Sequence, residues 1–122
     1  MIPFLLAGAG GLGLLGGGLA AFSGATARKI EKAVPRDGDL IEVNGETLHY
    51  VDSGSGPPIV MIHGLGGQLR NFGRAMVDDL ARDYRVIRVD RPGSGYSPRA
   101  AGRSARLRVQ AETIAEFIRI LK

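Results

Sequence analysis

The first 27 residues of this 122-residue chain carry no charged side chain, whereas all 16 basic and all 12 acidic residues lie between Arg28 and Lys122. A domain that folds in water is therefore limited to about 95 residues, which permits one modest domain and excludes a two-domain enzyme. A domain of this size buries only roughly two-thirds of the surface of its unfolded chain. Any fold that is normally built on a larger sheet is therefore expected to be marginally stable here.

An uncharged run at residues 2–22 is long enough to cross the hydrocarbon core of a bilayer as a helix. Eight glycines between residues 2 and 27 dilute its hydropathy, but glycine is tolerated in membrane helices and lets neighbouring helices approach closely. The basic residues Arg28, Lys29 and Lys32 follow the run, which by the positive-inside bias favours a cytoplasmic domain. We therefore expect residues 1–27 to be a membrane anchor with a single N-terminal span, and residues 28–37 to be a linker.

Three other interpretations of this segment stay open. The small residues Ala25–Ala27 resemble a signal-peptide cleavage site, which would lead to export of the domain, although no basic residue precedes the apolar run. Gly8–Gly13 match the GxGxxG dinucleotide-binding fingerprint, with Glu31 downstream. Against this reading, Pro3 disfavours the required strand and Gly16–Gly18 disfavour the required helix. The third interpretation is a buried segment of a soluble fold.

The chain beyond residue 37 has the pattern of a globular domain. Two β-rich runs, Leu40–Val43 and Thr47–Val51, flank Asn44–Gly45, and an Asn-Gly pair between such runs is a strong hairpin signal. The first two strands are therefore expected to be antiparallel neighbours. The next run, Ile59–Ile62, is apolar without interruption, which predicts a central strand buried on both faces.

Two helices and one more strand complete the predicted elements. The strand is expected at Val86–Val89. A helix before it is indicated by apolar residues at fourfold spacing: Phe72, Met76, Leu80 and Tyr84. The final helix has an apolar face made by Leu107, Ala111, Ile114, Ile118 and Leu121. A hairpin followed by alternating strands and helices indicates an α/β domain with a mostly parallel sheet and right-handed crossovers.

The glycine-rich turn His63–Gly67 carries the clearest chemical signal. It lies between the predicted buried strand and a helix, where successive backbone N–H groups point into one concavity. Such a concavity suits an anion, which can be a bound phosphate or an oxyanion that develops during a reaction.

Two segments carry a resemblance to a known family. Ile59–Gly67 reads IVMIHGLGG, and Asp90–Ser97, after the next strand, reads DRPGSGYS. With the hairpin before them, these motifs resemble the N-terminal third of an α/β-hydrolase, in which an HG-x-G turn supplies part of the oxyanion hole and a DxxGxGxS turn closes the following strand. The resemblance covers about residues 38–122 and implies an N-terminal portion of an α/β-hydrolase sheet, preceded by an apolar N-terminal helix.

The resemblance assigns roles to the glycine turn. The backbone N–H of Leu65 would donate to the oxyanion. Gly64, Gly66 and Gly67 would let the backbone approach the substrate. His63 would be a structural residue that orients the turn, outside any catalytic triad. Relatives of the epoxide hydrolase and haloalkane dehalogenase type carry proline at the position of Gly66, so glycine there favours an ester or related acyl substrate.

The DxxGxGxS turn is expected to be structural. A carboxylate in a turn rich in glycine and proline most often accepts hydrogen bonds from nearby backbone N–H groups, so we interpret Asp90 as such an acceptor and not as a general base. The other residues of the motif, Gly93, Gly95 and Ser97, are expected to fix the same turn.

The nucleophile and triad of the family are missing from these 122 residues. The family needs a serine in a GxSxG elbow, then an acid and then a histidine, and neither Ser94 nor Ser97 has the flanking glycines. The two histidines are His63 and His49, and His49 is expected on a strand surface. We therefore interpret the chain as an incomplete α/β-hydrolase. Its full-length form would be a serine hydrolase acting on a small molecule with an ester or related carbonyl group.

No cofactor, metal or nucleic acid is expected. The chain has no cysteine, and Asp78, Asp79 and Asp83 lack the histidine or glutamate that would complete a ligand set. Eight arginines lie between Arg82 and Arg108, but no nucleic-acid-binding motif accompanies them.

Two alternatives from other classes remain. The first is a non-catalytic, membrane-anchored truncated domain that pairs with a protein partner, because in the family's strand order the Ile59–Ile62 strand would have an open edge here. The second is a phosphate or nucleotide binder that uses the Gly64–Gly67 turn.

Overall fold

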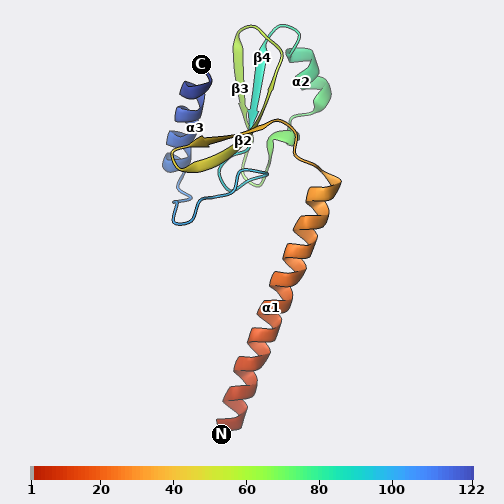
Figure 1. Ribbon diagram of the computed structural model, residues 1–122, viewed down its shortest axis with the longest axis vertical. Coiled ribbons are helices and arrows are strands. Elements are labelled where there is room, and N and C mark those ends of the chain that lie inside the picture. The colour runs from red at the N-terminus through yellow and green to blue at the C-terminus, as the bar shows by residue number, and fades with distance from the viewer. Residues whose placement is uncertain (1) are drawn as a thin grey trace. The chain divides into compact units, whose positions relative to one another are not determined.

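The computed structural model describes the backbone of residues 2–122 and the side chains of residues 15–122. Two compact units are present, Met1–Arg36 and Asp37–Lys122. The first unit consists mainly of one helix, α1 (Ile2–Ala33; Figure 1), which confirms the predicted apolar N-terminal helix. Gly8–Gly13 lie within this helix, so the strand and turn that a dinucleotide fingerprint needs are not formed.

The predicted single-span membrane anchor at residues 2–22 requires correction. Among the residues whose side chains are described, which start at Leu15, no helix is long and apolar enough to cross a membrane. Gly16–Gly18 lower the hydropathy of this stretch and charged residues begin at Arg28, so the apolar part is too short. The part of the predicted anchor at residues 1–14 lies outside the described side chains.

The second unit is built on a four-stranded mixed sheet with the order β1-β2-β4-β3. β2 is antiparallel to both β1 and β4, and β3 is parallel to β4. The strands are β1 (Asp39–Val43), β2 (Glu46–Ser53), β3 (Pro58–Ile62) and β4 (Arg85–Val89). The predicted hairpin is confirmed, because Asn44 and Gly45 both have positive φ angles, 50° and 76°, as a two-residue hairpin turn requires.

β3 lies at an edge of the sheet, as the family's strand order predicts for these residues, whereas the predicted central strand buried on both faces is wrong. Its backbone pairs only with β4 among the described residues. Ile59, Val60 and Met61 are partly buried, and Ile62 is 46% exposed. An apolar run is thus placed at an edge with a free row of backbone groups, a situation that proteins ordinarily avoid.

The helices α2 (Arg74–Leu80) and α3 (Leu107–Leu121) lie on opposite faces of the sheet (Figure 1), and a short 3-10 helix, η1 (Leu69–Asn71), precedes α2. The predicted fourfold face before β4 is wrong: in α2 it is Val77 that is buried, whereas Met76 and Tyr84 are exposed. The reason is that η1 and Gly73 interrupt the predicted helix, so its first turns do not continue into α2.

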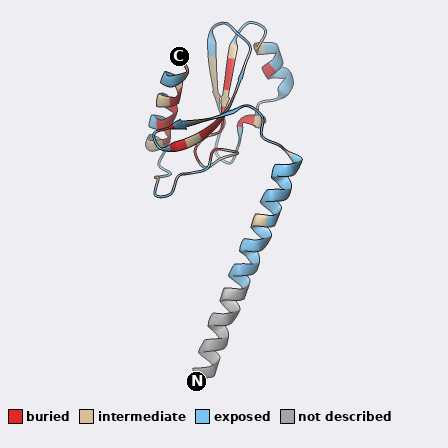
Figure 2. Ribbon diagram, in the orientation of Figure 1, coloured by how far each residue is buried: buried red, intermediate tan, exposed pale blue. Residues whose placement is uncertain are grey.

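The main core lies between α3 and the sheet. It comprises Val43, Leu48, Ile87, Val89, Ile114 and Phe117. The buried residues on the sheet-facing side of α3 are drawn red in Figure 2. The ring of Phe117 meets that of Tyr50 edge-on, with their centroids 5.4 Å apart. Strand alternation directs Ile87 and Val89 to this face, which leaves Val86 and Arg88 for the α2 face.

The buried face of α3 is rotated relative to the predicted one. Gln110, Thr113, Ile114 and Phe117 are buried, whereas Leu107, a predicted core residue, is 73% exposed. The rotation has a polar cause. The buried carboxylate of Glu46 accepts a hydrogen bond from the Thr113 hydroxyl at 3.1 Å and lies 3.7 Å from Nε of Arg103. The remaining predicted face lines an open groove of about 430 Å³ beside Ile62, formed by Leu107, Ala111, Ile114 and Ile118.

Candidate functional site

The two motif turns follow neighbouring parallel strands. His63–Gly67 comes directly after β3, and Asp90–Ser97 comes directly after β4. Because the carboxyl ends of parallel strands lie at the same edge of a sheet, the two turns are brought together. This edge is where α/β sheets ordinarily place their ligands.

His63 joins the two turns. Its ring is buried, and its Nε2 atom accepts a hydrogen bond from the backbone N–H of Arg91 at 3.0 Å. Its Nδ1 atom lies 2.8 Å from the carbonyl oxygen of Gly64, so this nitrogen carries the proton and donates. Both ring nitrogens are therefore engaged by backbone, and the residue holds the glycine turn against the turn after β4.

The glycine turn presents its backbone outward. The N–H of Gly67 donates to the carbonyl of Gly64 at 3.2 Å, which closes the bend. The side chain of Leu65 is 97% exposed, and within the described part of the chain its N–H donates to no acceptor. Gly66 has a φ angle of 72°, which proline cannot adopt. The N–H groups of Gly64 and Gly66 likewise donate to no acceptor in the described part of the chain, so the turn offers several backbone donors, Leu65 among them, at the carboxyl end of β3.

Asp90 is a buried acceptor at the centre of the site. Its Oδ1 atom accepts from the N–H of Leu69 at 2.7 Å, and its Oδ2 atom accepts from the N–H of Tyr96 at 3.0 Å. The Nδ1 atom of His49 lies 2.7 Å from the same Oδ2. With these three donors and 1% exposure, the carboxylate is engaged by the protein and is not directed at a substrate.

The remaining motif residues fix the turn after β4. The Ser97 hydroxyl donates to the carbonyl of Asp90 at 2.7 Å and accepts from the N–H of His49 at 2.8 Å. Gly93 donates its N–H to the carbonyl of Ser97 at 2.7 Å. Gly95 has a φ angle of 51° and packs so closely on Asp90 that a Cβ atom would overlap the carboxylate.

His49 is the residue that the sequence prediction missed. It was expected on a strand surface, but it is 1% exposed and contacts Asp90, the carbonyl oxygen of Asp37 and the ring of Tyr96. Leu48 and His49 are both buried because β2 is covered by the core on one face and by these loops on the other. The pairing of β2 with β4, which brings His49 to the Asp90 turn, was not predicted, and no local pattern around His49 signals it.

The described residues contain no group of three or more side chains able to hold a metal ion. Asp78 is exposed and lies 3.6 Å from Arg74 within α2. Asp79 is also exposed and lies 3.1 Å from Arg82, which follows the end of α2. These carboxylates therefore belong to a solvated surface.

Comparison with known proteins identifies the family. A family model described as alpha/beta hydrolase fold matches residues 57–122, which include both turns. The chain belongs to the α/β-hydrolase fold family. It is similar to (E)-2-((N-methylformamido)methylene)succinate hydrolase of Acinetobacter baylyi, with 39% identity over 54 residues, or 44% of this chain and 20% of that protein.

Two solved structures show the same fold. The Cif epoxide hydrolase from Acinetobacter nosocomialis matches with a TM-score of 0.64 and 31% identity, over 70% of this chain and 26% of that one. A membrane phospholipase A, described as a bacterial virulence factor, matches with a TM-score of 0.64 and 28% identity. The match covers 99% of this α/β-hydrolase chain and 41% of the phospholipase chain. The chain therefore spans less than half the length of each of these relatives.

Proposed function

We propose that this chain supplies half of the oxyanion hole of a serine hydrolase that acts on an ester or related carbonyl group. The observation that carries the proposal is the free N–H of Leu65 in a turn that His63 fixes to the next strand. When a serine hydroxyl attacks a carbonyl carbon, the carbonyl oxygen becomes an anion. A donor already aimed at that position lowers the barrier by about 3 kcal/mol.

The nucleophile, acid and base would come from other parts of a full-length protein. The 122 residues contain no GxSxG sequence, and the relatives named above are considerably longer than this chain. His63 and Asp90 cannot take these roles, because backbone groups and His49 occupy their polar atoms.

An ester is favoured over an epoxide by the glycine turn. Gly66 stands where the epoxide hydrolase type carries proline, and its φ angle of 72° is closed to proline. The match to a phospholipase A over nearly the whole chain supports the same choice.

The test uses the full-length product that contains these residues. A chromogenic short-chain ester should be hydrolysed, and a fluorophosphonate probe should label one serine outside residues 1–122 and abolish that hydrolysis. Styrene oxide serves as the competing substrate. Absence of labelling together with turnover of the epoxide would overturn the assignment to serine and ester chemistry.

A second candidate role is protein pairing through the edge of β3, which the free backbone row and the exposed Ile62 favour. A partner strand of the same protein or of another one would cover this edge. The N–H groups of Val60 and Ile62 point away from β4, so their protection from hydrogen exchange in the full-length protein, but not in residues 37–122 alone, would support it.

A further inference from the structure

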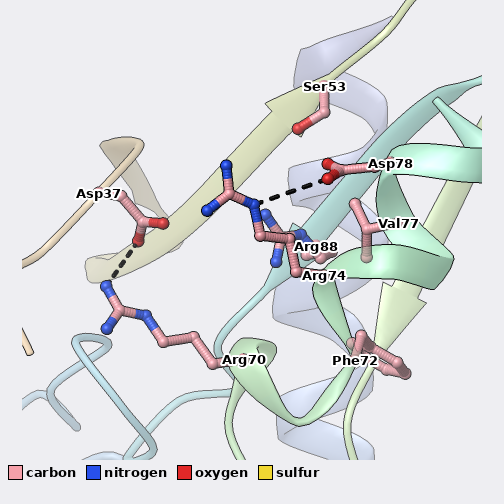
Figure 3. Close-up of a pocket in the computed structure, with 8 residues that line it drawn as sticks. All are labelled: Asp37, Ser53, Arg70, Phe72, Arg74, Val77, Asp78 and Arg88. Atoms are coloured by element: carbon pink, nitrogen blue, oxygen red, sulfur yellow. Dashed lines mark hydrogen bonds and ion pairs between the residues drawn. The ribbon is translucent and has the colours of Figure 1, made fainter. Parts of the chain in front are cut away.

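A cavity of about 520 Å³ lies on the α2 face of the sheet, and its lining residues include none from the two motif turns (Figure 3). Its lining includes three arginines from three elements: Arg70 of η1, Arg74 of α2 and Arg88 of β4. Ser53, at the end of β2, adds a hydroxyl, and Phe72 adds an aromatic ring. A cavity of this size holds a small organic molecule.

Arg88 occupies a position in β4 that would suit an apolar residue. Its neighbours Ile87 and Val89 pack into the core beneath α3, so its own side chain is on the other face, under α2. The Nε atom of Arg88 is buried and has no hydrogen-bond partner in the part of the chain that the structure describes. A buried guanidinium N–H without an acceptor is costly, because it has lost its water without gaining a bond.

The two carboxylates of the cavity pair with Arg70 and Arg74 and not with Arg88. Asp37 accepts a hydrogen bond from Arg70 at 3.1 Å. Burial alone would raise the pKa of Asp37, but the hydrogen bond from Arg70 holds it below the ordinary value. Asp78 lies 3.6 Å from Nε of Arg74 on the exposed surface of α2 (Figure 3). An acceptor for Arg88 must therefore come from outside the described residues.

We propose that this cavity binds the phosphate group of a small phosphorylated molecule, with Arg88 as the anchoring residue and Arg74 and Ser53 as further donors. Guanidinium groups that come from several elements suit a phosphate, whose oxygens point in several directions, better than they suit a flat carboxylate. The remaining volume, beside Phe72 and Val77, accommodates the organic part of the ligand. The site does not include the glycine turn, so it is independent of the proposed catalytic role.

The test measures binding by titration calorimetry on the full-length protein in chloride buffer, with phenyl phosphate and inorganic phosphate as probes. Phenyl phosphate should bind saturably and more tightly than inorganic phosphate. Arg88→Gln should weaken the binding of phenyl phosphate by about tenfold or more, since the substitution removes a charge-assisted hydrogen bond. Arg82→Gln is the matched control, because Arg82 is exposed, pairs with Asp79 and does not line the cavity. It should change the affinity less than about twofold.

Two further measurements keep the outcome interpretable. Arg88→Gln could lower the melting temperature strongly, and in that case Ser53→Ala, at the cavity wall, should still weaken the binding of phenyl phosphate. Arg88→Lys should bind phenyl phosphate more tightly than Arg88→Gln does. Benzoate provides the carboxylate comparison. No saturable binding of phenyl phosphate, equal binding by Arg88→Gln, or tighter binding of benzoate would each overturn the proposal.

Discussion

The Nδ1 atom of His49 and the Oδ2 atom of Asp90 lie 2.7 Å apart, and both side chains are 1% exposed. The pair joins β2 to the turn after β4. Through the N–H of Leu69, Asp90 also holds the segment that follows the glycine turn. Three segments that are distant in sequence are thus positioned by one carboxylate, and the shape of the glycine turn depends on it.

Asp90→Asn is expected to destabilise the protein by about 3 kcal/mol. The partners of the Asp90 carboxylate all donate hydrogen bonds, so the NH₂ group of asparagine would face another donor and leave it without an acceptor. Asp83→Asn, at an exposed position before β4, is the control and should change stability by less than about 0.5 kcal/mol. Urea unfolding of both variants measures the difference. Equal stability of the two variants would show that the Asp90 contacts contribute nothing.

Gly95→Ala should be more destabilising than Gly102→Ala. Both glycines have positive φ angles, 51° and 76°, so both substitutions carry the left-handed strain of roughly 1–2 kcal/mol. Only at Gly95 would the new methyl group overlap the Asp90 carboxylate, whereas the space around Gly102 is open. We expect an additional cost of about 2 kcal/mol at Gly95, measured by thermal and urea unfolding. Equal losses of stability in the two variants would mean that the turn around Gly95 accommodates the methyl group without an energetic penalty.

Local chemistry made part of this fold predictable from the sequence. Asn44 and Gly45 adopt the positive φ angles that define the hairpin, and the predicted bounds of the last helix coincide with α3, Leu107–Leu121. Long-range packing decided the rest. The burial of His49 depends on a turn more than 40 residues away, and the rotation of α3 depends on the buried pair of Glu46 and Thr113. Neither contact leaves a periodic signal in the sequence.

Arg70→Gln should raise the pKa of Asp37. Burial favours the neutral acid, but the hydrogen bond from Arg70 outweighs it and keeps the pKa below the ordinary value. A depressed carboxyl pKa stabilises the fold above the unfolded-state pKa, and this contribution is lost as the pH falls through the folded-state pKa. Asp37 is 51% exposed, so the contribution is under about 1 kcal/mol at neutral pH.

Carbon-detected NMR titration of the Asp37 carboxyl group measures this shift, and urea unfolding at neutral pH and at about pH 2 measures its linkage to stability. The stability difference between wild type and Arg70→Gln should shrink at the lower pH. An unchanged pKa of Asp37 in the variant would contradict the assigned cause.

Residues 37–122 expressed alone should self-associate, because β3 presents a free apolar edge. Ile62→Lys places a charge at that edge and should reduce the association. Ile120→Lys, at a similarly exposed position on α3, should not. Sedimentation velocity over a range of concentrations distinguishes these outcomes. A monomer with a sharp, cooperative thermal transition would count against an open edge.

The most direct test of the central claim removes the N–H of Leu65 without changing its side chain. An ester bond in place of the peptide bond before Leu65, introduced into the full-length protein with the α-hydroxy analogue of leucine, replaces that donor by oxygen. The same exchange at Ala75, in the first turn of α2, is the matched control, since an N–H there has no intrahelical partner. We predict that kcat for a chromogenic ester falls about 100-fold to 1,000-fold for the Leu65 exchange, with KM little changed, while the Ala75 exchange retains activity. Equal kcat values for the two exchanges would contradict the assignment of Leu65 to the oxyanion hole.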